Sequence, residues 1–213
     1  MKRYWADSLD EPGDPIKTAG ARPARSRAVN IALLRGINVG KAKRVAMADL
    51  RGLVEALGYD DVKTILNSGN IVFSAAHDAV RAANRIEEAM VAELGVASRI
   101  IGLSSDELEN VIARNPLPEA VSEPSRFLIA IVRDSSALAP LRKLEKQDWG
   151  AEVLALGKRE AWMWCPEGIL GGKLVESVGR ALGDTVTTRN WATLLRIRDA
   201  ASSIPLYRRT AAD

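Results

Sequence analysis

The sequence is poor in the side chains that most often hold metals or carry nucleophilic catalysis. It contains one cysteine, Cys165, and one histidine, His77. A single cysteine allows no internal disulfide, and these two residues are too few for a zinc site built from cysteine and histidine. We therefore expect no metal site, and a reducing cytoplasm is the compartment that such cysteine usage favours.

Long apolar runs are also missing. No stretch approaches the roughly 18 apolar residues that suggest a membrane span, and the first residues mix charges without the apolar centre of an export signal. With 47% hydrophobic and 27% charged residues, the composition is typical of a globular protein. The net charge of +3 is the difference between 30 basic and 27 acidic residues, which is too small an excess to indicate a nucleic-acid-binding protein by itself.

The distribution of prolines and apolar residues divides the chain of 213 residues. The first 27 residues lack any sustained apolar period, which predicts a disordered tail. Prolines at 116, 118 and 124 mark a linker. We therefore predict a first half over 28–116, a linker over 117–124, a second half over 125–204 and a C-terminal tail over 205–213.

The first half has the pattern of alternating strands and helices. Apolar residues run through 28–34 as in a central strand, and a helix with apolar positions at i, i+3, i+4 and i+7 ends at Gly58. Two short runs, 61–66 and 70–74, then predict a hairpin turning at Asn67–Gly69. A helix capped by Asp78 and a strand over 97–103 complete a βαββαβ order, and Ser104 with Glu107 has the spacing of a capping box.

The second half repeats this order in part. We predict a strand over 126–132, a helix through Leu138, Leu141 and Leu144, and a hairpin of 151–156 with 160–165. A helix over 174–182 follows, and a last helix starts at Trp191 after the segment 187–190. The fold class predicted is therefore α+β, with two ferredoxin-like halves packed together, βαββαβ and then a βαββα-type half.

Several motifs in fixed order resemble a known family. They are LLRGINVG, VAMADLRGLVEALGY, LNSGNIVF, WCPEG and TTRNWATLL, and they span about Ala28 to Ala201. In this respect the chain resembles the bacterial family named domain of unknown function 1697. The resemblance implies two ferredoxin-like halves but brings no established activity. The sequence departs from the family pattern at its tail, at Ala46 where a proline is usual, and at Gly171–Lys173 where a serine is common.

A candidate ligand site follows from the predicted topology of the first half. When the first and third strands are antiparallel neighbours, the loop after the first strand and the hairpin turn lie at the same end of the sheet. That end would gather backbone N–H groups, amides, a hydroxyl and positive charge, which suit a phosphate or another oxyanion. The residues predicted for this site are Arg35, Gly36, Asn38, Gly40, Lys41, Asn67, Ser68 and Asn70.

The same residues also have an explanation that needs no ligand. The glycines can serve only to permit positive φ, and the asparagines only to satisfy the backbone of the turns. The loop matches neither a Walker motif nor GxGxxG, so no known phosphate-binding motif supports the site, and no cofactor is predicted. Arg189 and Asn190 pose the same choice at the start of the last helix, where an anion could bind or Asn190 could simply cap the helix. Trp162 and Trp164 could stack on nucleic-acid bases or pack inside the sheet.

Three function classes remain open at this point. The first is a cytoplasmic binding protein for a phosphorylated small molecule, a nucleotide or a nucleic acid. The second is an enzyme that acts on an anionic substrate, although Cys165 has no neighbouring histidine in the sequence to activate it and no other nucleophile stands out. The third is a structural or partner-binding module. We expect no membrane association, and the oligomeric state is left open.

Overall fold

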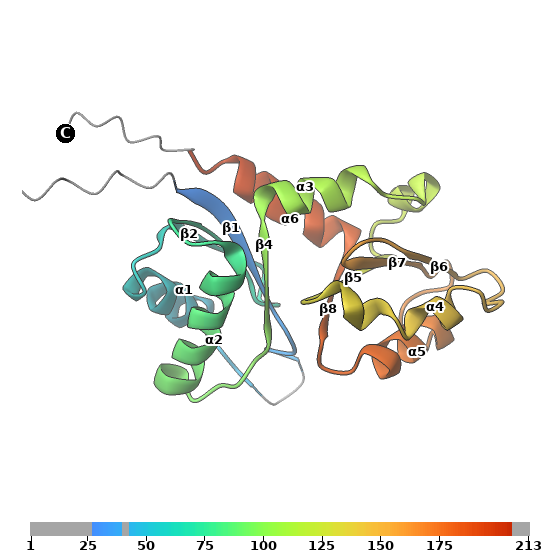
Figure 1. The fold of residues 1–213 in the computed structure, drawn as a ribbon, viewed down its shortest axis with the longest axis horizontal. Helices are drawn as coiled ribbons and strands as arrows, with labels where there is room; N and C mark the ends of the chain where they lie inside the picture. Colours follow the sequence, from blue (N-terminus) through green and yellow to red (C-terminus); the bar gives the residue numbers. More distant parts are fainter. Residues whose placement is uncertain (1–26, 40–42, 206–213) are drawn as a thin grey trace, which may run out of the picture.

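The computed structural model describes residues 27–39 and 43–205. These residues form two four-stranded sheets with helices packed on both faces (Figure 1). The elements, in chain order, are β1 (Ala28–Leu34), α1 (Met47–Ala56), β2 (Asp60–Ile65), β3 (Asn70–Ala75), α2 (Ala79–Leu94), β4 (Ile100–Ser104), α3 (Ser105–Ala113), the 3₁₀ helices η1 (Pro118–Ser122) and η2 (Ser135–Leu138) on either side of β5 (Phe127–Val132), α4 (Leu141–Leu144), β6 (Val153–Leu156), β7 (Glu160–Trp164), α5 (Lys173–Leu182), β8 (Val186–Asn190) and α6 (Trp191–Ser202).

The first half has the predicted βαββαβ order. Its sheet runs β2-β3-β1-β4, and every neighbouring pair is antiparallel. The β2–β3 hairpin turns where the sequence indicated, and Gly69 is required there. It has a φ of +75°, and a Cβ on it would lie 2.7 Å from the side chain of Ile37. The loop after β1 and the hairpin turn therefore do lie at one end of the sheet, as the topology predicted.

The second half adopts the same arrangement, with the strand order β6-β7-β5-β8. The predicted fold class of two ferredoxin-like α+β halves is confirmed. One strand was missing from the prediction, because Val186–Asn190 forms the edge strand β8 and not merely the approach to the last helix. The predicted helix through Leu138 and Leu144 is divided into the 3₁₀ helix η2 and the single turn α4.

Alternation along the central strands builds three apolar clusters. In β1, Ile31 and Leu33 face one cluster while Ala32 and Leu34 face another, because successive side chains of a strand point to opposite sides. The outer faces of the two sheets pack against α1 and α2 in the first half and against α4 and α5 in the second. The inner faces contribute to a single shared core, to which β1, β4, β5 and α6 all supply buried side chains.

Helix α6 occupies the junction of the two halves. Its buried residues Trp191, Leu194, Ile197 and Ala201 all belong to the shared core. The helix contacts β1, β2 and β3 of the first half as well as β5 and β8 of its own half, and it lies beside α3 (Figure 1). The two halves are therefore joined through a common apolar interior.

The predicted domain boundaries stay predictions. Nearly all of the predicted N-terminal tail and of the predicted tail over 205–213 lies outside the described residues. The predicted linker over 117–124 contains the 3₁₀ helix η1, and Ala120 of this helix is buried in the shared core. Among the helices of residues 27–39 and 43–205, none is long and apolar enough to span a membrane.

Candidate functional site

The loop after β1 is held by its own polar side chains. Asn38 has a left-handed φ of 55°, its side-chain amide donates to the carbonyls of Val45 and Asn67 at 2.9 Å each, and its oxygen accepts from the Val45 N–H. Asn38 thus ties the loop to the β2–β3 hairpin. The predicted proximity of loop and hairpin is real, and the amide of Asn38 is used to maintain it. Gly40 and Lys41 lie outside the described residues.

Asn70 and Ser68 hydrogen-bond to each other within the turn of the β2–β3 hairpin. The buried Asn70 amide donates to the Ile65 carbonyl at 2.7 Å and to the Ser68 hydroxyl at 3.1 Å. A hydroxyl that accepts one hydrogen bond still has its own hydrogen to donate, so Ser68 keeps a donor at the exposed surface of the turn. Asn67 is exposed, and the contact it makes with the loop is through its backbone carbonyl.

Arg189 comes from β8 of the second half and inserts into this end of the first half. Its Nε donates to the Asn70 side-chain oxygen at 2.5 Å, and its Nη2 donates to the Leu34 carbonyl at 2.6 Å and the Ser68 carbonyl at 3.0 Å. Its Nη1 donates to the Thr187 hydroxyl and the Thr188 carbonyl, both at 2.8 Å. The guanidinium therefore has no donor left for a ligand, and it acts first as a clamp between the halves.

Arg189 is nevertheless an unusual charge. Only 8% of the residue is exposed, and burial lowers the pKa of its guanidinium to about 10, which keeps it positive at neutral pH. All its acceptors are neutral, and no carboxylate among the described residues pairs with it. An uncompensated positive charge therefore lies beside the predicted loop.

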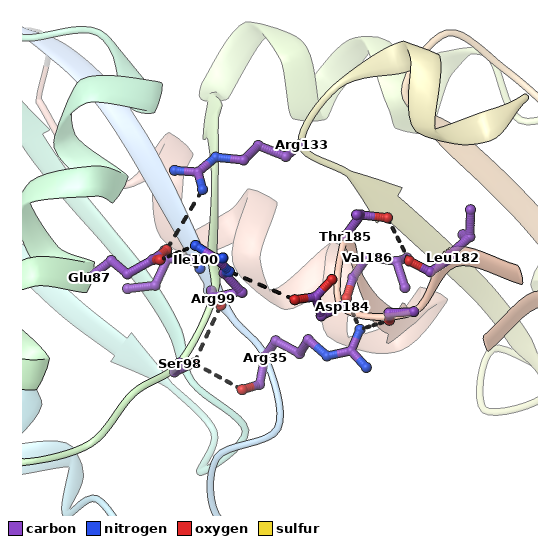
Figure 2. A network of polar contacts seen from close by, with 11 residues as sticks. Arg35, Glu87, Ser98, Arg99, Ile100, Arg133, Leu182, Asp184, Thr185 and Val186 are labelled. Carbon is purple, nitrogen blue, oxygen red and sulfur yellow. Dashed lines mark hydrogen bonds and ion pairs between the residues drawn. The ribbon is translucent and has the colours of Figure 1, made fainter. Parts of the chain in front are cut away.

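A second arginine follows β1 and also reaches across the junction. Arg35 donates to the carbonyls of Gly183 and Val186, and its own carbonyl accepts from Ser98 at 2.8 Å (Figure 2). Beside it, Glu87 pairs with Arg99 at 2.9 Å and lies 3.9 Å from Arg133 of the second half (Figure 2). This network holds the rim where the two halves meet.

These elements enclose a cleft of about 530 Å³ between the halves. The first half contributes Arg35, Gly36 and Ser68 from the predicted site, together with Ile37 and Val39. The second half contributes Arg189, Asn190 and an apolar wall from β5, β7 and α5. The residues of this wall are Leu128, Met163, Val175, Val178 and Gly179. Sequence reasoning missed the wall, since nothing in the sequence places α5 opposite the loop after β1.

The helix that starts at Trp191 opens onto the same cleft. Asn190 caps it by accepting from the Thr193 N–H at 2.9 Å, which is the local role that its sequence position allowed. Both residues line the cleft, so the positive end of the α6 dipole faces it. Thr188, which is exposed, adds a hydroxyl to the same rim.

The candidate residues for nucleophilic catalysis and base stacking do not line the cleft. Cys165 is fully buried in the apolar cluster of the second half, and burial raises the pKa of its thiol to about 12, so it is not a thiolate at neutral pH. Trp162 is buried in the shared core and Trp164 packs against it, which agrees with packing inside the sheet. In the part of the chain that the structure describes, no three His, Cys, Asp or Glu side chains are placed to hold a metal ion.

Comparison with known proteins adds a family and a fold. The family model described as "Protein of unknown function (DUF1697)" matches residues 28–162. No curated protein matches the chain. The solved structure of the conserved bacterial protein SP0830 from Streptococcus pneumoniae is similar with a TM-score of 0.66 and 21% sequence identity, over 83% of this chain and 99% of the other. That similarity supports the fold alone.

Proposed function

The chain belongs to the family of proteins of unknown function DUF1697, and from that premise we propose that the cleft between its halves binds a small anionic, phosphate-bearing ligand. The observation that carries this proposal is the buried positive charge of Arg189 in the lining of the cleft, with no carboxylate paired to it among the described residues. An opposite charge nearby favours the charged form of a desolvated group, and a bound anion would supply it.

The rim of the cleft can contact such an anion directly. Because the N–H groups of Arg189 are already donated to backbone and side-chain oxygens, this residue attracts the ligand through its field. Hydrogen bonds would come from the hydroxyls of Ser68 and Thr188, which line the cleft and are exposed. The amino-terminal end of α6 adds a positive dipole to the same place.

The rest of the cleft favours an apolar body on the ligand. Its volume of about 530 Å³ falls within the ~300–1,000 Å³ that small-molecule sites occupy. Met163 and Val178 are buried residues of its wall, and Val175 is partly buried beside them. A ligand that joins an anionic group to an apolar body would match both sides of this cleft.

The test uses two dyes that share one body and differ in charge. The anion 8-anilinonaphthalene-1-sulfonate and its neutral analogue N-phenyl-1-naphthylamine are titrated by fluorescence at low and physiological salt. We expect saturable binding of the sulfonate, about tenfold or more tighter than that of the neutral dye, because about 1.4 kcal/mol of charge interaction gives a factor of ten. Equal affinity for the two dyes would contradict an anion site.

Competition then identifies the anion. Adenosine 5′-monophosphate should displace the sulfonate dye, whereas adenosine should not. If neither the monophosphate nor inorganic phosphate competes, the ligand is not phosphate-bearing. If a short RNA competes far better than the monophosphate, the cleft is part of a nucleic-acid surface. Consumption of a bound monophosphate would move the protein to the enzyme class.

A pair of matched variants locates the binding in the cleft. Thr188→Glu places a carboxylate on the rim and should weaken binding of the sulfonate dye by about tenfold or more, since like charges a few ångströms apart repel by more than 1 kcal/mol. Thr188→Gln has nearly the same size and no charge, and it should bind almost as the wild type does. If both variants bind unchanged, the dye is bound elsewhere.

A further inference from the structure

Gly179 is a glycine inside a helix with no packing reason to be one. It lies within α5 (Lys173–Leu182), has an ordinary negative φ and lines the cleft. A Cβ built on it would meet no atom within 4 Å. Glycine is the least favourable residue in a helix interior apart from proline, because its backbone loses the most freedom on folding. An alanine would therefore fit and would stabilise the helix.

The space beside Gly179 is part of the cleft itself. Val175 and Gly179 are four residues apart, so they lie on one face of α5, and both line the cleft, as does Gly183, which caps the C-terminal end of the helix with a φ of +55°. Two of these three positions have no Cβ. The wall is therefore low over the last turn of α5, roughly 5 Å, from Gly179 to the cap at Gly183.

A second helix offers an internal comparison. Gly52 lies within α1 (Met47–Ala56), is exposed and also has no atom within 4 Å of a built Cβ. Unlike Gly179, it does not line the cleft. Any effect of a side chain on helix stability should therefore appear at both positions, while an effect on a ligand in the cleft should appear only at Gly179.

We propose that Gly179 determines the shape of the ligand that the cleft accepts, by leaving a flat stretch of α5 against which a planar ring of the ligand lies. This inference rests on the proposed function and specifies its substrate class: an anion with a flat ring system, in preference to one with a flexible chain. The wall opposite the rim is apolar, and the thioether of Met163 in the lining suits contact with a ring.

The experiment uses four variants of the full chain with the same sulfonate dye. Gly179→Ala and Gly52→Ala should both raise the melting temperature. Gly179→Ala should weaken dye binding about threefold and Gly179→Leu about tenfold or more, as added atoms fill the space that the ring needs. Gly52→Ala and Gly52→Leu should bind as the wild type does. A gain in stability combined with a loss of binding is not expected of a merely structural position.

Shape preference is tested on the wild type. Naphthalene-1-sulfonate and decane-1-sulfonate carry the same number of carbons, one in a flat ring system and one in a chain, and the second is used below its micelle concentration. We expect the naphthalene compound to displace the dye at the lower concentration, and this preference to disappear in Gly179→Leu.

The outcomes separate this inference from the proposed function. If the wild type shows no saturable binding of the sulfonate dye, the proposed function fails. If the wild type binds but Gly179→Leu binds equally well, or the chain competes as well as the ring, only the role of Gly179 is wrong. If the Gly52 variants lose binding to the same extent as the Gly179 variants, the effect is general to the fold and the inference is likewise overturned.

Discussion

The two halves of this protein have the same sequence of elements and differ most at the positions where they touch. Strand register makes the halves comparable: Ile31 pairs with Leu103 on β4 as Ile129 pairs with Arg189 on β8. Leu103 and Arg189 are therefore equivalent, and both are buried. One half places leucine in the shared core, and the other places a buried guanidinium beside the cleft.

A second pair of equivalent positions shows the same exchange. Leu33 pairs with Asn70 in the first half as Ile131 pairs with Glu160 in the second. Asn70 accepts from Arg189, whereas Glu160, only 1% exposed, lies 3.5 Å from Arg114. Each of these two buried side chains thus faces an arginine from another element, although Oε1 of Glu160 accepts no hydrogen bond. The comparison teaches that similar sheets can be joined through ionic groups as well as apolar ones, provided that the facing position changes too.

The largest effect on folding is expected when the two halves are separated. Each half alone would expose the face of its sheet that now contributes to the shared core. We therefore expect residues 27–117, produced alone, to lack cooperative unfolding. In the full chain, cleavage at a protease site inserted in 117–124 should leave the halves together in gel filtration. Halves that elute separately in native buffer after cleavage would show that the shared apolar core does not hold them.

Replacing Arg189 with the leucine found at the equivalent position tests whether this exchange changes the stability of the protein. Arg189→Leu removes the donor for several buried oxygens, among them the Leu34 carbonyl and the Asn70 side chain. We expect a loss of about 3–5 kcal/mol in the free energy of unfolding, measured with urea. Arg180→Leu is the control, because the Arg180–Glu176 pair on α5 is exposed and should contribute less than about 1 kcal/mol. A loss under about 1 kcal/mol for Arg189→Leu would mean that the clamp is dispensable.

A smaller effect on stability is expected where the ends of β3 and β7 are compared. Cys165 follows β7 at the position equivalent to Ala75, and both are buried. Since burial raises the pKa of the Cys165 thiol from 9.0 to about 12, the folded state retains this proton while the unfolded state loses it. Stability from this group is complete below pH 9 and declines as the pH rises toward 12.

The matched variant is Cys165→Ala, which makes the second half resemble the first. We expect its free energy of unfolding to fall less steeply between pH 8.5 and pH 10.5 than that of the wild type, because it lacks the titrating thiol. Urea titrations across this range measure the difference. Parallel pH profiles for the two proteins would contradict the burial of a protonated thiol.

Local signals predicted much of the fold because they act over short distances. The capping box at Ser104 and Glu107 is present, with bonds of 2.9 and 3.1 Å, and Asp78 and Gly95 delimit α2 as the sequence indicated. Strand β8 was missed because Thr187, Thr188 and Arg189 are polar, as is common before a helix. The β-branched residues from Val186 and the echo of the βαββαβ order were the signals that could have identified it.

The candidate site was predictable only where one half supplies all of it. The approach of the loop after β1 to the hairpin follows from topology, and Asn38 confirms it with its bonds to Val45 and Asn67. The insertion of Arg189 and the wall of α5 depend on how the halves pack. Such packing results from many long-range contacts that leave no periodic signal in the sequence.

The position of α6 in the chain has a consequence for the order of events during translation. This helix fills the junction, yet it is the last element that the structure describes. When the first half leaves the ribosome, only α3 covers the inner face of its sheet, and α6 is complete at Ser202, roughly 100 residues after the end of β4 at Ser104. At the typical rate of about 5–20 residues per second, this interval lasts about 5–20 seconds. The nascent chain must therefore protect an apolar sheet for that time, which makes the first half the segment that a ribosome-associated chaperone would need to shield.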